Sequence, residues 1–560
     1  MKIFLAQQNY HIGNFEINTQ KIIDVILAAK SQSADLVVFS ELSVCGYPPR
    51  DFLYFKNFID QCYHSIDIIK KYANGIAVLV GGPHRNEALE GKDLFNAAYF
   101  LEDQEIKQVI HKTCLPTYDV FDENRYFEPA NDWNLVEFKG KKLAITICED
   151  IWNLGSNPLY KYCPMDILMG DQPDLMINMS ASPFDYTHGA DRLATVKANV
   201  LKYGIPMFYC NGVGSQTEIV FDGTSLVFDK DANLCGKLAS FKEDSQAFIL
   251  NDNGSIQGPI LEPASQLPDA ELNPLGLEPA LHIAQVYEAL ILGVKDYFSK
   301  MGFTKAIIGS SGGIDSAVTL ALACEALGKE NVTAVLMPSE FSTDHSVSDA
   351  EALSKKLGNP YHVIPIANIY DSFLKELKPL FADLPFSVAE ENLQSRTRGN
   401  LLMAIANKFG YILLNTSNKS ELATGYGTLY GDMAGGLSVL GDCYKLQVFE
   451  LAKFINRNEE IIPLHILTKP PSAELRPGQK DSDSLPDYEV LDKLLYQYIE
   501  FSKGPEEIKT AGFDGALVDR VLKMVNVNEY KRNQFCPIIR VSPKAFGVGR
   551  RVPIVGKYLS

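Results

Sequence analysis

A stretch rich in proline and glycine, residues 251–279, interrupts this chain of 560 residues near its middle. Such a composition is typical of a linker and argues against a helix; its breakers are Gly254, Gly258, Pro259, Pro263, Pro268, Pro274, Gly276 and Pro279. A chain of this length is also too long for a single hydrophobic core. We therefore predict a first domain over residues 1–255, a linker over 256–280 and a second domain over 281–560.

Short apolar runs alternate with helical stretches on both sides of this linker. In the first half the expected strands include Ile3–Ala6, Leu36–Phe39, Ile76–Val80, Phe95–Leu101, Leu143–Cys148, Leu175–Met179 and Ile205–Cys210. In the second half, expected strands Lys305–Ile308, Thr333–Met337, Tyr361–Pro365 and Tyr411–Asn415 alternate with helices Leu281–Lys300, Ser316–Leu327 and Asp349–Leu357. This alternation predicts the α/β class for both domains, with a doubly wound parallel sheet in the second.

The composition is that of an ordinary soluble globular protein, with 46% hydrophobic and 22% charged residues. A net charge of −17 without a lysine or arginine run argues against nucleic acid as a partner. No apolar run approaches the roughly 18 residues that a membrane-spanning helix needs, and the first residues are too polar for a signal peptide. Ten cysteines without CxxC pairs predict reduced thiols and a cytoplasmic protein.

Three ionisable residues of the first half stand at the ends of predicted strands. Glu41 follows residues 35–40, Lys112 follows residues 106–111, and Cys148 ends residues 143–148. Side chains at strand ends of α/β folds converge on a crevice. A cysteine is only partly thiolate near neutral pH, so it needs a base such as Glu41 and a cation such as Lys112. These residue types predict attack of Cys148 on an amide, with release of ammonia and formation of a thioester.

Each of these residues also has an ordinary interpretation. A cysteine at a strand end is most often a small buried hydrophobic residue. Glu41 alone fits a turn or a helix cap, and Lys112 alone fits a solvated charge. Spacing by itself leaves these alternatives open.

Three segments of the first half resemble the signature segments of the nitrilase (carbon–nitrogen hydrolase) superfamily: Glu41–Pro49, His111–Tyr118 and Cys148–Trp152. The resemblance covers most of residues 1–250 and implies an α-β-β-α sandwich with Glu41, Lys112 and Cys148 as its catalytic triad. The first half is similar to the glutaminase branch of this superfamily, and this similarity implies that Tyr118, Ser182 and His188 contact glutamine. At the position of His188 that branch often carries a basic residue.

A glycine- and serine-rich loop follows the first predicted strand of the second half, in Ser310-Ser311-Gly312-Gly313-Ile314-Asp315-Ser316. Glycines let backbone N–H groups approach an anion, and the N-terminus of the next helix adds its dipole. An aspartate in such a loop makes sense as a Mg²⁺ ligand beside phosphate. The alternative for a glycine loop in general is a plain turn between strand and helix.

This loop resembles that of the PP-loop ATP pyrophosphatases, which cleave ATP between the α and β phosphates and adenylate a substrate. GxxxxGK[ST] is absent, so a γ-phosphate transfer loop is not expected. The resemblance implies ATP contacts from the following residues: Gly309, Ser310, Ser311, Gly312, Gly313, Ile314, Asp315, Ser316 and Thr416.

Further segments resemble the NAD synthetase family, namely Glu391–Arg398, Asn415–Tyr426 and Tyr430–Asp432, and the closing run Phe546–Ile554 is similar to its glutamine-dependent members. The resemblance covers roughly residues 280–560. It implies that deamido-NAD contacts Asn392, Arg396, Glu421, Asp432, Lys445 and Lys531. Asp315 and Glu421 would hold Mg²⁺.

These residues also have ordinary alternatives. Arg396 and Arg398 fit surface ion pairs, Gly425-Tyr426-Gly427 fits a turn, and Asp442 and Lys445 fit a simple ion pair with each other.

Together the resemblances imply an enzyme that hydrolyses glutamine and uses ATP to amidate nicotinic acid adenine dinucleotide (deamido-NAD), with glutamine, ATP and deamido-NAD as small-molecule partners and Mg²⁺ as cofactor. They also imply a homo-oligomer. Three rivals are another PP-loop amidotransferase, an RNA-modifying PP-loop protein and an assembly protein with decayed sites. Residues 415–432 argue against the first, the net charge and lack of CxxC against the second, and Glu41, Lys112, Cys148 and Asp315 together against the third.

Overall fold

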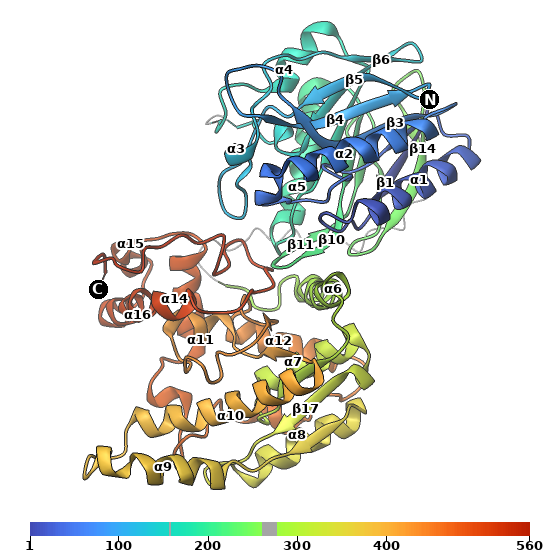
Figure 1. The fold of residues 1–560 in the computed structure, drawn as a ribbon. Coiled ribbons are helices and arrows are strands. Elements are labelled where there is room, and N and C mark those ends of the chain that lie inside the picture. The colour runs from blue at the N-terminus through green and yellow to red at the C-terminus, as the bar shows by residue number, and fades with distance from the viewer. Residues whose placement is uncertain (156–157, 260–276, 560) are drawn as a thin grey trace. The chain divides into compact units, whose positions relative to one another are not determined.

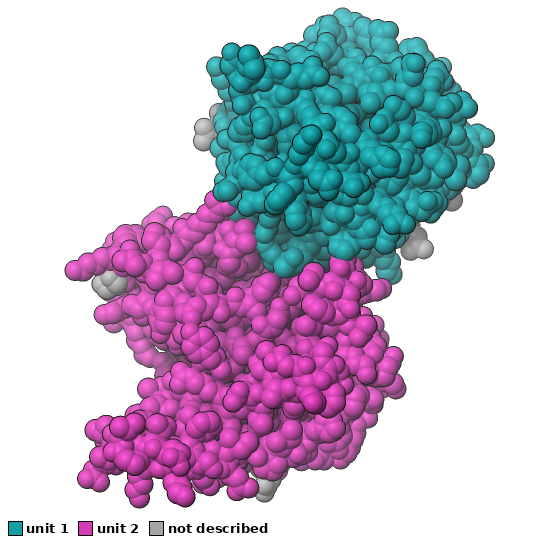
Figure 2. All heavy atoms as spheres, viewed as in Figure 1, with its two compact units in different colours: residues 1–269 teal, residues 270–560 magenta. Residues whose placement is uncertain are grey.

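The computed structural model describes residues 1–155, 158–259 and 277–559. The chain forms two compact units, Met1–Asp269 and Ala270–Ser560 (Figure 2). We call them unit 1 and unit 2. Residues 260–276 of the predicted linker lie outside the described residues, so the domain boundaries at 255 and 281 stay predictions.

Unit 1 contains two large β-sheets (Figure 1). The seven-stranded sheet has the order β15-β14-β1-β2-β3-β4-β5; its strands are β1 (Lys2–Gln7), β2 (Leu36–Val38), β3 (Ala77–Arg85), β4 (Leu94–Glu102), β5 (Glu105–His111), β14 (Asp244–Leu250) and β15 (Ile256–Gln257). The six-stranded sheet has the order β13-β12-β9-β8-β7-β6; its strands are β6 (Val136–Phe138), β7 (Lys141–Ile147), β8 (Leu175–Ser180), β9 (Met207–Asn211), β12 (Leu226–Phe228) and β13 (Leu234–Lys237). A separate hairpin pairs β10 (Val213–Gln216) with β11 (Ile219–Asp222).

Alternation along the strands builds four layers. In β1, Ile3 and Leu5 face a core shared with the other sheet, whereas Phe4 faces a second core with the first two helices. These helices are α1 (Phe15–Ser31) and α2 (Lys56–Ile69). A third core places Val196 of α5 (His188–Tyr203) and Met165 of α4 (Pro164–Leu168) against the outer face of the six-stranded sheet. Successive side chains point to opposite faces of a strand, and both sheets are covered, so the predicted α-β-β-α sandwich is confirmed.

Unit 2 is built on a parallel sheet with the order β18-β17-β16-β19-β20. Its strands are β16 (Ala306–Gly309), β17 (Val332–Leu336), β18 (Tyr361–Val363), β19 (Ile412–Asn415) and β20 (Leu437–Ser438). The chain runs outward from β16 through β17 to β18 and then returns to β19 on the other side. In such a doubly wound sheet, ligands bind where the strand order reverses, at the carboxyl ends of the strands. The predicted doubly wound sheet is confirmed.

Helices cover this sheet and extend beyond it. Leu402 and Ala406 of α10 (Val388–Phe409) pack on Ile307 of β16, while α6 (Ile283–Met301), α7 (Ile314–Leu327) and α12 (Lys445–Ile455) pack together. The remaining helices are α8 (Asp344–Leu357), α9 (Ala367–Phe381), α11 (Lys419–Thr424), α13 (Leu464–Thr468), α14 (Tyr488–Ile499), α15 (Pro505–Thr510), α16 (Gly515–Val527) and α17 (Glu529–Arg532). Within the described ranges, no helix is long and apolar enough to cross a membrane.

Candidate active sites

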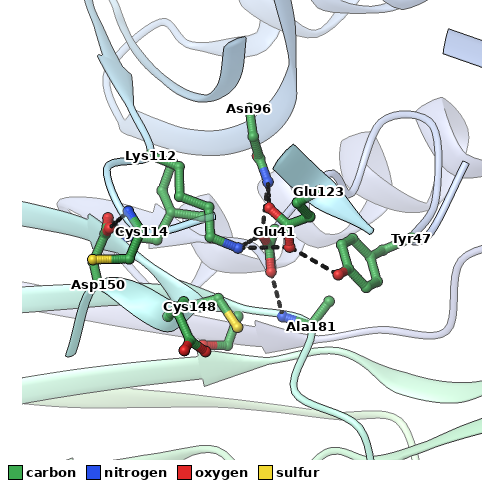
Figure 3. Close-up of polar contacts among 12 residues, drawn as sticks. Glu41, Tyr47, Asn96, Lys112, Cys114, Glu123, Cys148, Asp150 and Ala181 are labelled. Carbon is green, nitrogen blue, oxygen red and sulfur yellow. Dashed lines mark hydrogen bonds and ion pairs between the residues drawn. The ribbon is translucent and has the colours of Figure 1, made fainter. Parts of the chain in front are cut away.

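The three residues predicted at strand ends in unit 1 meet in one place (Figure 3). Glu41 lies in the loop after β2, and Lys112 directly follows β5 in the same sheet. Cys148 follows β7 of the other sheet, but it begins the 3₁₀ turn η3 (Cys148–Ile151), whereas the predicted strand included it. The site therefore lies where loops from both sheets of the sandwich come together.

The Lys112 ammonium sits between two carboxylates. Its Nζ donates to Oε1 of Glu41 at 2.7 Å and to Oε1 of Glu123 at 2.8 Å. The side chains of Lys112 and Glu41 are both 0% exposed. Burial lowers the pKa of Lys112, but the two carboxylates outweigh burial and hold that pKa well above its usual value. The site thus keeps a permanent cation in a region without solvent.

Glu123 is a site residue that sequence reasoning missed. It begins the short helix α3 (Glu123–Tyr126) and is buried. Its carboxylate accepts from Lys112, from the Tyr47 hydroxyl at 2.8 Å and from Asn96 Nδ2 at 3.2 Å. Burial raises its pKa. No strand end or spacing marks Glu123 in the sequence, because tertiary packing alone brings it to Lys112.

Glu41 is held at both of its carboxylate oxygens. Oε1 accepts from Lys112 and, at 2.7 Å, from Asn96 Nδ2, while Oε2 accepts from the backbone N–H of Ala181 at 3.0 Å. Such hydrogen bonds fix the carboxylate in one orientation, which a general base requires.

Cys148 is 4% exposed and adopts a φ of 43°, which is uncommon for a residue with a side chain. Burial, followed by the charge of Glu41, raises the pKa of its thiol, whereas Lys112 lowers it. The thiol is therefore protonated at rest and needs a base to become a nucleophile. A buried cysteine among apolar side chains only would have no such neighbours, so the geometry favours the catalytic interpretation over the ordinary one.

The three residues expected to contact glutamine lie in two groups. The half-exposed Tyr118 donates to both carboxylate oxygens of Glu149 at 3.0 Å, and Glu149 is the neighbour of Cys148 in sequence. Ser182 Oγ lies 2.9 Å from Nε2 of His188, whose ring stacks on Trp152 with 4.9 Å between centroids. Burial raises the pKa of Glu149 to about 7, although Lys112, Tyr118 and Tyr160 lower it.

The glycine loop of unit 2 lines a cavity of about 270 Å³ at the reversal of the strand order. All of residues 309–316 line it, as do Thr416, Glu421, Asp432 and Lys445. Gly312 has a φ of +77°, and a Cβ placed on it would lie 2.2 Å from the Ser346 carbonyl oxygen. A side chain cannot fit there, so this loop conformation requires glycine.

Lys445 joins the two carboxylates that were expected to bind metal. Its Nζ lies 2.6 Å from Oδ2 of Asp315 and 3.5 Å from Oε1 of Glu421. Asn418 donates to Oδ1 of Asp315 at 2.9 Å. Burial and then Asp315 raise the pKa of Glu421 to about 8. The alternative pairing of Lys445 with Asp442 is wrong, because Asp442 pairs with Lys419 at 2.8 Å.

Asp315 and Glu421 fit a Mg²⁺ site of the nucleotide-binding kind. Mg²⁺ is held in such sites by one or two carboxylates, and phosphate oxygens and water complete the octahedron. Each carboxylate raises the cost of a negative charge on the other, as the pKa of Glu421 shows, and a divalent cation would remove that cost. Across the described residues, no group of three or more metal-ligating side chains occurs.

The residues expected to bind deamido-NAD surround the segment Gly425–Asp432. Asn392 Oδ1 accepts from the Thr428 hydroxyl at 2.7 Å, and Arg396 donates to the Leu429 carbonyl at 3.2 Å. Lys531 donates to the carbonyls of Gly425 and Gly427 at 2.7 and 2.9 Å. Of the residues expected to bind deamido-NAD, Glu421, Asp432 and Lys445 line the cavity. Asn392, Arg396 and Lys531 hold the segment Gly425–Asp432 beside it.

Sequence reasoning missed the wall of the cavity formed by residues 469–475 and Asp481. Lys469 Nζ lies 2.7 Å from Oε1 of Glu474, which also accepts from the Ser346 hydroxyl at 2.7 Å. Arg398 lines the same cavity and donates to the Met337 carbonyl at 3.0 Å, so it is no surface ion pair. Nothing in the sequence places residues 469–481 beside the glycine loop.

Comparison with protein families gives one match for each unit. The carbon-nitrogen hydrolase family matches residues 2–249, and the NAD synthase family matches residues 286–535.

Relatives match the chain over its whole length. The glutamine-dependent NAD(+) synthetase of Synechocystis sp. is 45% identical, over 99% of this chain and 98% of that protein. The enzyme of the same name from Thermotoga maritima is 40% identical, over 100% of this chain and 99% of that protein. A solved structure of the glutamine-dependent NAD(+) synthetase of Acinetobacter baumannii, in complex with ADP, superposes with a TM-score of 0.77 at 37% identity and covers 99% of this chain and 98% of its own.

Proposed function

This chain belongs to the glutamine-dependent NAD(+) synthetases, and we propose that its two units divide that reaction between Cys148 in unit 1 and the glycine loop in unit 2. Unit 1 would release ammonia from glutamine. Unit 2 would use ATP to activate the carboxylate of deamido-NAD, and ammonia would convert it to the amide of NAD. The products are NAD, AMP, diphosphate and glutamate.

In the first half-reaction, Glu41 takes the proton of the Cys148 thiol while the sulfur attacks the amide carbon of glutamine. The Lys112 ammonium stabilises the oxyanion of the tetrahedral intermediate. That intermediate collapses to a thioester, and the nitrogen leaves as ammonia with the proton that Glu41 held. Water then attacks the thioester with Glu41 as base, which gives glutamate and restores the thiol.

The observation that carries this proposal is the buried cluster around Lys112. A cation with 0% exposure lies 2.7 and 2.8 Å from two carboxylates and lowers the pKa of the neighbouring Cys148 thiol against the effect of burial. Burying charges in this way is costly, so a purely structural role would be served better by apolar residues. We assign the binding of glutamine to Tyr118, Ser182 and His188. Tyr118 bonds Glu149, the residue after Cys148, and Ser182 bonds His188, whose ring stacks on Trp152.

In the second half-reaction, the glycine loop of residues 310–316 and the N-terminus of α7 would hold the phosphates of ATP. The carboxylate of deamido-NAD attacks the α-phosphorus, diphosphate leaves, and ammonia then displaces AMP from the acyl adenylate. Lys445 would offset negative charge on the phosphates. Mg²⁺ held by Asp315 and Glu421 would supply further positive charge to the phosphates when bound. Asn392, Arg396, Asp432 and Lys531 would shape the deamido-NAD site, and Thr416 would contact ATP.

A cytoplasmic location and a homo-oligomeric assembly complete the proposal. All ten cysteines are free, which suits a reducing compartment. The oligomer rests on the family resemblance, and sedimentation of the purified protein tests it.

The test is to supply ATP, Mg²⁺ and deamido-NAD with either glutamine or ammonium and to quantify NAD and AMP, in the native protein and in Cys148→Ala. The native protein is expected to form NAD from both nitrogen sources, and the variant from ammonium alone. NAD formation from glutamine by Cys148→Ala would overturn the role of Cys148. Glutamine hydrolysis without NAD from either source would overturn the role of unit 2.

A further inference from the structure

Asp150 is a buried carboxylate that the reaction described above does not use. It is the third residue of η3 and is 2% exposed. Both of its carboxylate oxygens bind backbone N–H groups. Oδ1 accepts from Thr113 at 3.0 Å and from Cys114 at 2.8 Å, and Oδ2 accepts from Ile147 at 2.9 Å.

These three N–H groups flank two residues of the triad. Thr113 and Cys114 directly follow Lys112, and Ile147 directly precedes Cys148. Lys112 comes from the seven-stranded sheet, while Cys148 comes from the six-stranded sheet. Figure 3 shows the Asp150 carboxylate directed at the backbone of Cys114, beside Lys112. One side chain therefore ties together the two loops that carry the cation and the nucleophile.

The same carboxylate closes the turn at Cys148. Ile147 directly precedes this turn and Asp150 is its third residue, so the bond from the Ile147 N–H to Oδ2 spans Cys148 and Glu149. Between them Cys148 adopts its positive φ of 43°. A residue with a side chain rarely adopts this region of backbone conformation, and it persists there only where the surroundings impose it. The Asp150 carboxylate bridges the turn at this point through its bond from the Ile147 N–H.

We propose that Asp150 is a positioning residue, which fixes the Cys148 thiol relative to the Lys112 ammonium by binding the backbone on both sides. The inference rests on the proposed function of Cys148 and deepens it. Asp150 donates or accepts no proton in the reaction and contacts no substrate. Three N–H donors face its two oxygens, so the site requires an acceptor at both positions.

Asparagine at this position would keep one acceptor and replace the other with an N–H₂ donor. The new N–H₂ group would then face either the Ile147 N–H or the N–H groups of Thr113 and Cys114. At least one of the three backbone hydrogen bonds would be lost. Misplacement of reacting groups by about 1 Å costs on the order of 100-fold in rate. We expect kcat for glutamine hydrolysis by Asp150→Asn to fall about 100-fold, with the KM for glutamine changed by less than about threefold.

A matched control is Asp174→Asn. The Asp174 carboxylate accepts the Lys142 N–H at 2.7 Å, at the opposite end of β7 from Cys148. It tests the loss of a carboxylate charge that accepts a backbone N–H on the same strand, away from the site, where the one remaining oxygen of asparagine can still accept that bond. We expect native kcat from it.

The test measures glutamine hydrolysis, NAD synthesis from ammonium and the rate of Cys148 alkylation by iodoacetamide in native protein, Asp150→Asn, Asp174→Asn and Cys148→Ala. We expect Asp150→Asn to lose kcat and alkylation rate while it keeps its thermal unfolding transition and its NAD synthesis from ammonium. A folded Asp150→Asn with native kcat would overturn the proposal. A KM for glutamine that rises about 100-fold while kcat stays native would also overturn it, because that result would indicate a contact between Asp150 and the substrate.

Two further arms keep the result decisive. If Asp150→Asn does not fold, Asp150→Glu takes its place. Glutamate keeps both acceptor oxygens but shifts them by one methylene group. A folded Asp150→Glu with native kcat would contradict the proposal. Cys148→Ala separates the two claims. Equal glutamine hydrolysis by Cys148→Ala and native protein refutes the function proposed for unit 1, whereas loss in Cys148→Ala with native activity in Asp150→Asn refutes only the role of Asp150.

Discussion

The two candidate sites handle charge in opposite ways. In unit 1 the Lys112 and Glu41 side chains are 0% exposed and their charges are paired within the protein. In unit 2 the Asp315 and Glu421 side chains are 17% and 18% exposed and border a cavity. A small neutral amide needs a site whose charges are already fixed by packing. A polyphosphate brings its own charge, so its site needs donors and cations that face open space.

The largest effect is expected where the fixed charges of unit 1 are broken. Lys112→Met leaves the Glu41 and Glu123 carboxylates buried without their cation, which should cost about 3–5 kcal/mol of unfolding free energy and abolish glutamine hydrolysis. Denaturant unfolding and a glutaminase assay measure both. Adding Glu123→Gln to Lys112→Met should restore part of the stability but none of the activity. An unchanged unfolding free energy in Lys112→Met would show that the Lys112 ammonium does not stabilise the buried carboxylates of Glu41 and Glu123.

The corresponding change in unit 2 should cost activity and little stability. Lys445→Met removes the cation beside Asp315 and Glu421, and NAD synthesis from ammonium should fall about 100-fold. Lys453→Met on the same helix is the control, because Lys453 is an exposed residue paired with Glu450 at 2.6 Å. Glutamine hydrolysis is expected to stay native in both. Equal rates of NAD synthesis in the two variants would contradict the role of Lys445.

The glycine loop offers a change of backbone shape alone. Gly312→Ala puts a Cβ 2.2 Å from a backbone oxygen, so the loop must move, and we expect ATP-dependent NAD synthesis to fall about 30-fold. Gly302→Ala separates this clash from strain, because Gly302 has a φ of +74° with nothing within 4 Å of its Cβ position. Equal losses in the two variants would assign the effect to backbone strain.

The smallest effect concerns Mg²⁺ and pH. The pKa of Glu421 is raised to about 8 by burial and Asp315, above its unfolded value, so the proton is held below pH 8 and Mg²⁺ must displace it. The apparent Mg²⁺ affinity in the presence of ATP should therefore weaken as pH falls, by up to about tenfold from pH 8 to pH 7. Glu421→Gln should show a weaker affinity with a flatter pH dependence. An equal pH dependence in Glu421→Gln and native protein would exclude Glu421 as the titrating ligand.

Sequence patterns located the parts of both sites that depend on strand ends. Glu41, Lys112 and Cys148 each stand at the end of a predicted strand. β2 and β5 run in the same direction within one sheet, which brings Glu41 and Lys112 to one edge, whereas Cys148 comes from the other sheet. The glycine loop likewise follows β16 directly. Periodicity also indicated the covered strands, because buried runs such as Ile3–Ala6 leave a clear signal.

The residues that complete the sites left no such signal. Glu123 reaches Lys112 through the packing of α3, and Asn96 of β4 reaches the carboxylates of Glu41 and Glu123. Asp150 binds the backbone N–H groups of Thr113 and Cys114, 37 and 36 residues away, as well as that of Ile147. The 22-residue helix α10 was not predicted, since apolar and polar residues are mixed around it. Asp442 and Lys445 lie close in sequence but take different partners, Lys419 and Asp315, and only the tertiary structure decides this.

The most direct test of the account follows the nitrogen atom. Native protein and Cys148→Ala are supplied with ATP, Mg²⁺, deamido-NAD and glutamine labelled with ¹⁵N at the side-chain amide, and the NAD formed is analysed by mass spectrometry. We expect NAD with ¹⁵N in its amide from the native protein and no labelled NAD from Cys148→Ala. Labelled NAD from Cys148→Ala, or none from a native protein that makes NAD from ammonium, would contradict it.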